Sequence, residues 1–233
     1  METIVWKGRL GPMNLAASPQ TFRPTTITHL MADALEVREG DVVIDVGCGS
    51  GVLGVIAAKL GAAKVYGVDM SPDVVEVCTT SAAANGVADR MEFFHGDLFE
   101  PLPDALRADV IIGDVSGVPD AIAGDSGWFP SKTGGGPRGS ELPMRMLRGA
   151  RQRLAARGRL LLPTATLQDE RALLDVARSA FSSVAKITER TIPLTGALAQ
   201  KASIKRLVDE GVIHLGQRGS RLIWEARVWL CHA

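Results

Sequence analysis

The chain has 233 residues, of which 46% are hydrophobic and 22% charged, and its 26 basic residues balance its 26 acidic ones. This composition is typical of a folded globular protein, and a formal net charge of zero creates no overall field that attracts a polyanion, so we do not expect a nucleic-acid partner. No apolar run approaches the length of a membrane span and no signal peptide opens the chain, so we expect a cytoplasmic protein without a membrane partner.

The first 38 residues precede the main α/β pattern. Residues 3–10 predict a strand, and residues 26–37 predict a helix whose apolar positions form a stripe. Between them, Phe22 and Thr25 belong to a helix entry in which the threonine can cap the first turn. We expect this segment to act as a lid on a core of residues 39–233, the whole chain forming one domain.

The core opens with a strand, a glycine turn and a helix. Residues 42–46 are apolar and rich in β-branched side chains, which predicts a buried parallel strand, and residues 52–60 have helical periodicity. Gly47, Gly49 and Gly51 lie between them. Glycines let the backbone turn sharply and let a ligand approach it closely.

Two acids give this turn a ligand preference. The next predicted strand, residues 64–68, leads to Asp69, which lies 22 positions after Gly47, where nucleotide-binding βαβ units carry a ribose-binding acid. Asp45 lies inside the preceding strand. A carboxylate there would repel a pyrophosphate and would favour a ligand that carries an amino group.

The rest of the chain continues to alternate helices and strands. We expect helices at residues 71–85, 141–156, 169–181 and 198–210, and strands at residues 91–95, 108–112, 159–163, 183–189, 212–215 and 221–230. This order requires an α/β fold, which we expect to be Rossmann-like, with a mostly parallel seven-stranded sheet, an antiparallel last strand and helices on both faces. The arginines of the helix at residues 141–156 should lie on a solvated face, away from the strand ends.

Polar residues follow two later core strands at their carboxyl ends, where ligands gather in open α/β sheets. Gly96, Asp97 and Leu98 follow the third of these strands, and Asp97 can contact a ligand or simply cap a turn. Asp114 and Ser116 follow the fourth. Asp114 can orient a nucleophile or remove its proton, with Ser116 adding a hydrogen bond, or the two can cap the loop and bind an amino group of the cofactor.

Residues 119–139 read as one long loop, which in a compact domain is usually a lid or a binding loop. Trp128 and Phe129 either face a substrate or pin this loop to the core. We expect three segments to come together over the strand ends: residues 21–25, 124–139 and 191–201.

Cysteine and histidine usage points away from a structural metal. Cys48, Cys78 and Cys231 are widely spaced and odd in number, which indicates reduced thiols. The four histidines have no metal-ligand spacing with them, so we predict no metal. The sequence leaves the oligomeric state open.

The stretch Val-Ile-Asp-Val-Gly-Cys-Gly-Ser-Gly at residues 43–51 resembles the first motif of class I S-adenosylmethionine-dependent methyltransferases. The resemblance spans about residues 20–165 and is nearest to the amino-group methyltransferases related to those that modify glutamine in release factors, whose pre-core element the Phe-Arg-Pro-Thr-Thr stretch also resembles. It implies a class I methyltransferase fold with S-adenosylmethionine as the cofactor. The implied cofactor contacts are Phe22, Thr25, Asp45, Gly47, Gly49, Gly51, Asp69, Met70, Gly96, Asp97, Leu98 and Asp114.

The resemblance breaks down at the catalytic loop. The relatives carry Asn-Pro-Pro-Tyr after the fourth strand, whereas this chain has Asp-Val-Ser-Gly at residues 114–117, so a planar amide or nucleobase nitrogen is not the expected acceptor. We expect an enzyme, a methyltransferase that acts on a small molecule in specialised biosynthesis, with Asp114 and Ser116 as catalytic residues. One alternative is a lyase that cyclises the cofactor to azetidine-2-carboxylate and methylthioadenosine, with no partner beyond the cofactor. Another is a non-catalytic cofactor-binding module.

Overall fold

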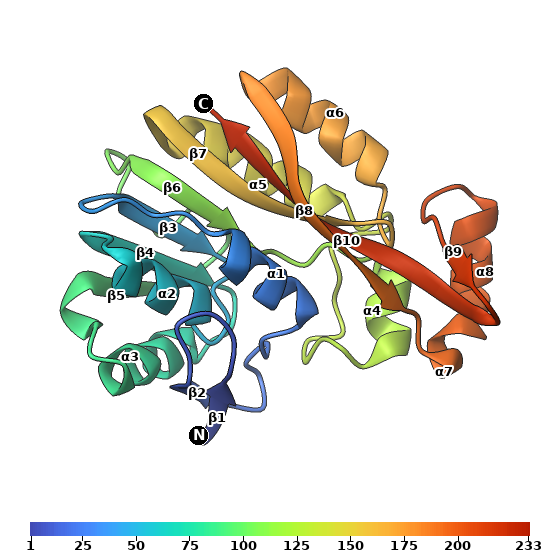
Figure 1. The fold of residues 1–233 in the computed structure, drawn as a ribbon, viewed down its shortest axis with the longest axis horizontal. Coiled ribbons are helices and arrows are strands. Elements are labelled where there is room, and N and C mark those ends of the chain that lie inside the picture. The colour runs from blue at the N-terminus through green and yellow to red at the C-terminus, as the bar shows by residue number, and fades with distance from the viewer.

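The computed structural model describes residues 1–233 and contains a large mixed sheet flanked by helices, with a small N-terminal hairpin beside it (Figure 1). The hairpin strands are β1 (Glu2–Trp6) and β2 (Met13–Ala17). The large sheet contains β3 (Val42–Val46), β4 (Lys64–Asp69), β5 (Met91–His95), β6 (Ala108–Gly113), β7 (Leu154–Ala165), β8 (Ser183–Pro193), β9 (Gly216–Arg218) and β10 (Arg221–His232).

The strand order of the large sheet is β5-β4-β3-β6-β7-β10-β8, with β9 paired to β10. Strands β5, β4, β3, β6 and β7 run parallel to one another, whereas β10 runs antiparallel to both β7 and β8. The predicted mostly parallel sheet with an antiparallel last strand is therefore confirmed, and β9 is a short additional strand paired to the start of β10.

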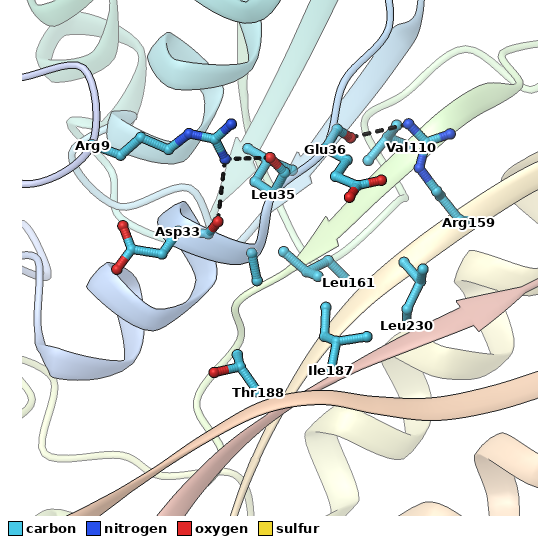
Figure 2. Close-up of a pocket in the computed structure, with 11 residues that line it drawn as sticks. Arg9, Asp33, Leu35, Glu36, Val110, Arg159, Leu161, Ile187, Thr188 and Leu230 are labelled. Carbon is cyan, nitrogen blue, oxygen red and sulfur yellow. Dashed lines mark hydrogen bonds between the residues drawn. The ribbon is translucent and has the colours of Figure 1, made fainter.

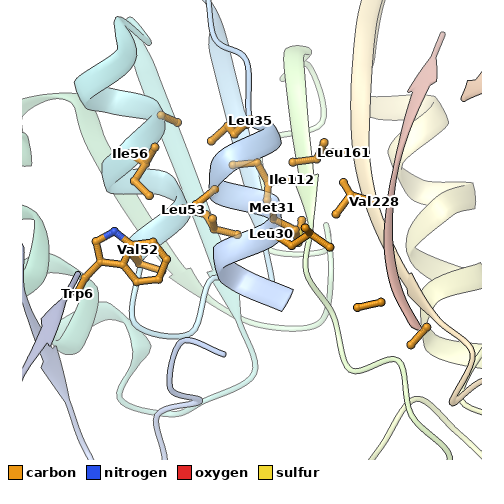
Figure 3. Packing of buried hydrophobic residues seen from close by; sticks show 14 of the residues in the cluster. Trp6, Leu30, Met31, Leu35, Val52, Leu53, Ile56, Ile112, Leu161 and Val228 are labelled. Carbon is orange, nitrogen blue, oxygen red and sulfur yellow. The ribbon is translucent and has the colours of Figure 1, made fainter. Parts of the chain in front are cut away.

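The helices are α1 (Thr26–Ala34), α2 (Val52–Leu60), α3 (Val74–Ala84), α4 (Asp120–Ser126), α5 (Glu141–Arg153), α6 (Glu170–Ala180), α7 (Gly196–Ala199) and α8 (Ala202–Asp209). Side chains of the central strands alternate between two hydrophobic cores because successive strand residues point to opposite faces. In β3, Val43 belongs to the core that includes α1 and α2, and Ile44 belongs to the core that includes α5 and α6. Figure 3 shows the first core, where Met31 of α1 packs near Ile112 and Leu161 of the sheet.

Several predicted boundaries are wrong. Residues 3–10 do not form one strand: the chain turns after β1, where the Gly11 N–H donates to the Gly8 carbonyl at 2.9 Å, and returns as β2. The strand expected at residues 212–215 is absent, because Val212 and Ile213 enter the first core from a turn and pairing begins only at Gly216. The helix expected at residues 198–210 is divided into α7 and α8, and the long loop at residues 119–139 contains α4. No helix has the length and apolar character needed to cross a membrane.

Candidate functional site

A cavity of about 820 Å³ opens where β3, β4, β6 and β7 reach their carboxyl ends. Residues of the N-terminal segment, of the chain after α4, of the end of β8 and of the start of β10 complete its walls. Every charged side chain that lines it is an aspartate: Asp69, Asp97 or Asp114. An acidic lining without a basic side chain favours a ligand that carries positive charge.

The glycine turn after β3 forms part of the floor. Gly47 has φ +78°, and a Cβ there would lie 2.3 Å from the Asp114 carbonyl oxygen, so only glycine lets the turn touch the loop after β6. Gly49 has φ +53°, and a Cβ on it would lie 3.0 Å from the Phe22 carbonyl oxygen. Gly47 lines the cavity. Gly49 and Gly51 do not line it, and their positive φ angles form the rest of the turn.

Asp69 fixes this floor through both oxygens of its carboxylate. One oxygen accepts the Gly49 N–H at 2.9 Å and the other accepts the Ser71 N–H at 2.8 Å. The side chain thereby ties the glycine turn to the approach to α3 while it lines the cavity, next to Met70. This is the geometry in which a carboxylate at the end of a second strand can also accept hydrogen bonds from a ribose.

Asp45 does not occupy the place that the sequence predicted for it. It is 1% exposed and lies outside the cavity lining, where one carboxylate oxygen accepts the Gly54 N–H at 2.9 Å and the other has no partner. Burial, reinforced by the nearby Asp114, raises the pKa of Asp45 to about 8. Asp45 therefore supports the first turn of α2 from beneath the cavity rather than lining the cavity itself.

The loop after β5 supplies Gly96, Asp97 and Leu98 to the cavity wall. Arg145 of α5 forms an ion pair with Asp97. The prediction that the arginines of this helix stay away from the strand ends is therefore wrong for Arg145, because α5 begins close enough for a long side chain to reach β5. The Asp97 carboxylate has a protein partner as well as an open side toward the cavity.

Asp114 and Ser116, the two predicted catalytic residues, both line the cavity after β6. Burial, followed by the negative charge of Asp69, raises the pKa of Asp114 to about 7, and no hydrogen bond offsets these two effects. A carboxyl group with a pKa near neutrality can exchange a proton with a bound group under physiological conditions. The structure thus makes Asp114 a suitable proton acceptor.

The Gly-rich segment after α4 holds the Asp114–Gly117 loop in place. The Gly135 N–H donates to the Val118 carbonyl at 2.7 Å. A Cβ on Gly135 would lie 2.5 Å from the Ser116 carbonyl oxygen, so the two backbones meet at a distance that no other residue allows. This glycine-rich run therefore frames the Asp114–Gly117 loop.

Aromatic side chains form the outer part of the cavity. Phe22 stacks on Phe129 with ring centroids 5.2 Å apart, and Trp128 lies 6.4 Å from Trp224 of β10. All four residues line the cavity, so Trp128 and Phe129 both face it and pin their loop to other elements. Thr25 also lines it and accepts the Ile27 N–H at the start of α1.

The three segments expected to converge do share this cavity, through Phe22 and Thr25, through Trp128 and Phe129, and through residues 192–195 around the end of β8. The lining residues that the sequence analysis missed include Gln168 and Trp224. Gln168 follows the carboxyl end of β7, a position that the switch-point rule could have indicated. Trp224 comes from the amino-terminal half of an antiparallel strand, and no sequence signal places it there.

A second cavity, of about 410 Å³, lies between α1 and the strands β6, β7, β8 and β10 (Figure 2). Its two arginines are occupied with neighbouring protein groups. Arg9 donates to the Leu35 carbonyl, and Arg159 donates to the Glu36 carbonyl and to Asp41, both at 3.0 Å. These bonds satisfy carbonyl groups at the C-terminal end of α1. Both guanidinium groups are therefore bonded to protein groups.

The three cysteines are free and buried, and Cys48 and Cys78 have their sulfur atoms 3.9 Å apart beneath the glycine turn. The hydrogen bond with Cys78, together with burial, raises the pKa of the Cys48 thiol well above its usual range. The Cys48 thiol therefore stays protonated, and both cysteines pack as buried groups behind the turn.

One family model and several known proteins match part of the chain. The family model described as "Ribosomal protein L11 methyltransferase (PrmA)" matches residues 22–116, the part of the chain that contains the glycine turn and Asp114. A ribosomal protein L11 methyltransferase of Salmonella arizonae is 41% identical over 101 residues, which are 43% of this chain and 33% of that protein. The chain thus spans about a third of the length of the relatives that it matches.

Solved structures share the fold over a longer stretch. A 16S rRNA N2 G1207 methyltransferase of T. thermophilus, solved with AdoMet and guanosine, has a TM-score of 0.64 at 17% identity and covers 99% of this chain and 50% of its own. A ribosomal protein L11 methylase of Lactobacillus delbrueckii subsp. bulgaricus has a TM-score of 0.53 at 16% identity, with 88% and 77% covered. At these identities the likeness concerns the fold alone.

These comparisons overturn one expectation from the sequence. A small-molecule acceptor, or no partner beyond the cofactor, was expected, and nucleic acid was not. The relatives are instead named for macromolecular substrates, a ribosomal protein and a ribosomal RNA. The absence of Asn-Pro-Pro-Tyr and the neutral net charge were misleading guides to the substrate. Neither feature determines how large a substrate can reach the cavity.

Proposed function

We propose that this chain, which belongs to the class I S-adenosylmethionine-dependent methyltransferases, methylates an amino group of a protein, with ribosomal protein L11 as the first candidate. One observation carries the proposal: the charged side chains of the cavity are all aspartates, and aromatic rings stand beside them. A protein amine arrives as a cation, and both carboxylates and aromatic faces attract cations. A substrate on the ribosome would place the enzyme in the cytoplasm.

The residues at the strand ends fit S-adenosylmethionine. Gly47 lets the turn pack against the loop after β6 while it lines the cavity, Asp69 can accept hydrogen bonds from the ribose, and Asp97 with the backbone of Leu98 can bind the adenine edge. Phe22 and Thr25 cover the cofactor from the N-terminal segment. When bound, S-adenosylmethionine supplies a methyl group activated by a sulfonium centre.

The residues around the Asp114–Gly117 loop would deprotonate and orient the amine that accepts the methyl group. Asp114, with a pKa near 7, takes a proton from the arriving ammonium group and leaves a neutral nitrogen with a free lone pair. Ser116 offers a further hydrogen bond from the same loop. Trp128, Phe129 and Trp224 hold the apolar stem of the amine side chain, so that the nitrogen lines up with the methyl carbon. Alignment of this kind lowers a barrier by on the order of 7–11 kcal/mol in favourable cases.

The test is a labelled transfer assay with two substrates side by side. The protein is incubated with S-adenosylmethionine that carries a deuterated methyl group, together with unmethylated ribosomal protein L11 or with unmodified 16S rRNA. We expect label on L11, mapped to an amine by peptide mass spectrometry, and lost in Asp114→Asn. Label on the RNA alone, or on neither substrate, would contradict the proposal.

A further inference from the structure

Gln168 lies in the cavity wall beside the catalytic loop, in the turn that joins β7 to α6. It is 2% exposed, and a Cβ on Gly117 would lie 2.7 Å from its Oε1 atom. Gly117 is the last residue of the Asp114–Gly117 loop, so the carboxamide of Gln168 sits next to the acceptor end of the site rather than at the cofactor end.

The Nε2 atom of this buried carboxamide has no hydrogen-bond partner. Its polar neighbours on the same segment are all satisfied. Thr164 donates to Glu170 and accepts from the Trp229 ring N–H at 2.9 Å, and Thr166 accepts the Glu225 N–H at 3.1 Å. A buried amide without a partner destabilises the fold, and such groups are rare in folded proteins. On this segment Gln168 is the residue left without a partner, and its side chain lines the cavity.

The backbone holds Gln168 firmly in this position. Its N–H donates to the Ala165 carbonyl at 3.2 Å, and its carbonyl accepts the Glu170 N–H at 2.7 Å. The next residue, Asp169, caps α6 by accepting the Ala172 N–H at 3.1 Å and pairs with Arg138 at 2.8 Å. The side chain is therefore presented on a rigid turn, which keeps the entropy cost of a new contact low.

We propose that Gln168 is a specificity-determining residue that hydrogen-bonds a main-chain peptide group of the methylated polypeptide, an inference that rests on the proposed function. A carboxamide can both donate and accept, and so can a peptide group, so the two form a matched pair in either orientation of the side chain. A free small amine has no such group and leaves Gln168 unpaired. The residue thus favours an amine that belongs to a polypeptide, and it acts on acceptor binding without contact with the cofactor.

Gln168→Met tests this inference, because methionine has a similar shape and lacks both polar atoms. Gln152→Met is the matched control, since Gln152 is exposed on α5. The assays are the KM for unmethylated ribosomal protein L11, the dissociation constant of S-adenosylmethionine by calorimetry, and the melting temperature. We expect Gln168→Met to raise the KM for L11 about tenfold, the value of one lost hydrogen bond. Cofactor affinity should change less than about twofold, and the melting temperature should not fall, because the folded protein loses no bond.

An unchanged KM for L11 in Gln168→Met would overturn the inference and leave the proposed function standing. A lower melting temperature together with weaker cofactor binding would also overturn it, because Gln168 would then be a structural residue. If the unmodified enzyme does not methylate L11 at all, the proposed function fails first and the inference fails with it.

Discussion

Asp69→Ala should weaken cofactor binding and loosen the floor of the site at the same time. The substitution removes two hydrogen bonds from backbone N–H groups to a carboxylate, at 2.9 Å from Gly49 and 2.8 Å from Ser71. Bonds to a charged group contribute about 1.5–3 kcal/mol each, and because water can reach this half-buried side chain we expect the free energy of unfolding to fall by about 2–3 kcal/mol in total. Loss of the ribose contact should reduce affinity for S-adenosylmethionine by about 1.5–3 kcal/mol, or roughly 10- to 150-fold.

Calorimetric titration gives the affinity, and denaturant unfolding gives the stability. Asp89→Ala is the matched control, because Asp89 is exposed in the short 3₁₀ helix η1 (Ala88–Arg90). It should leave both quantities unchanged. If Asp69→Ala binds S-adenosylmethionine as tightly as the unmodified protein, the ribose assignment is refuted, even where the stability falls as expected.

Three further outcomes are expected. Gly49→Val should abolish cofactor binding while circular dichroism still reports a folded protein. The new Cβ would lie 3.0 Å from the Phe22 carbonyl oxygen, at a φ of +53° that valine rarely adopts. The control Gly124→Ala, which has open space around it, should bind the cofactor normally. The rate should rise with pH through about 7 as Asp114 loses its proton, and a profile that stays flat would contradict its role as a base. Hydrogen exchange should slow on cofactor binding in residues 21–25, 124–139 and 191–201; continued fast exchange in the second segment would refute closure of a lid.

The raised pKa values also set the sign of the pH dependence of stability. Asp45 and Asp114 have pKa values near 8 and 7 in the folded protein and about 3.8 in the unfolded chain, so the folded state retains protons that the unfolded chain has released. The free energy of unfolding contributed by these two groups is therefore highest below about pH 4 and declines as pH rises toward about 8. Bound positive charge beside them should offset part of this decline.

Sequence patterns predict this fold well where hydrophobic periodicity and strong turn signals agree. The run at residues 42–46, the turn at Gly47 and the helix that follows all lie where the pattern placed them. The hairpin of β1 and β2 was missed because Gly8 was assigned to one strand over residues 3–10, and Gly11 and Pro12 to a loop after it rather than to a reversal. Val212 and Ile213 were read as a strand because burial in a turn leaves the same apolar signal as burial in a sheet.

The candidate site was predictable only where residues are close in the chain or lie at strand ends. Asp69, Asp97, Asp114 and Ser116 follow parallel strands, and all four line the cavity. Asp45 was misplaced because side-chain direction within a strand decides whether it faces a cavity or a helix, and here the Gly54 N–H captures it. The pairing of Trp128 with a strand almost a hundred positions later depends on tertiary packing that no local pattern records.

The central claim is that the activated methyl group leaves the cofactor and arrives on a protein. A single-turnover reaction with enzyme in excess over S-adenosylmethionine, in the presence of ribosomal protein L11, can be quenched and its small molecules measured by mass spectrometry. We predict adenosylhomocysteine, formed in step with methylated L11 and absent when L11 is left out. Methylthioadenosine as the co-product, or adenosylhomocysteine without any methyl group on the protein, would contradict the account.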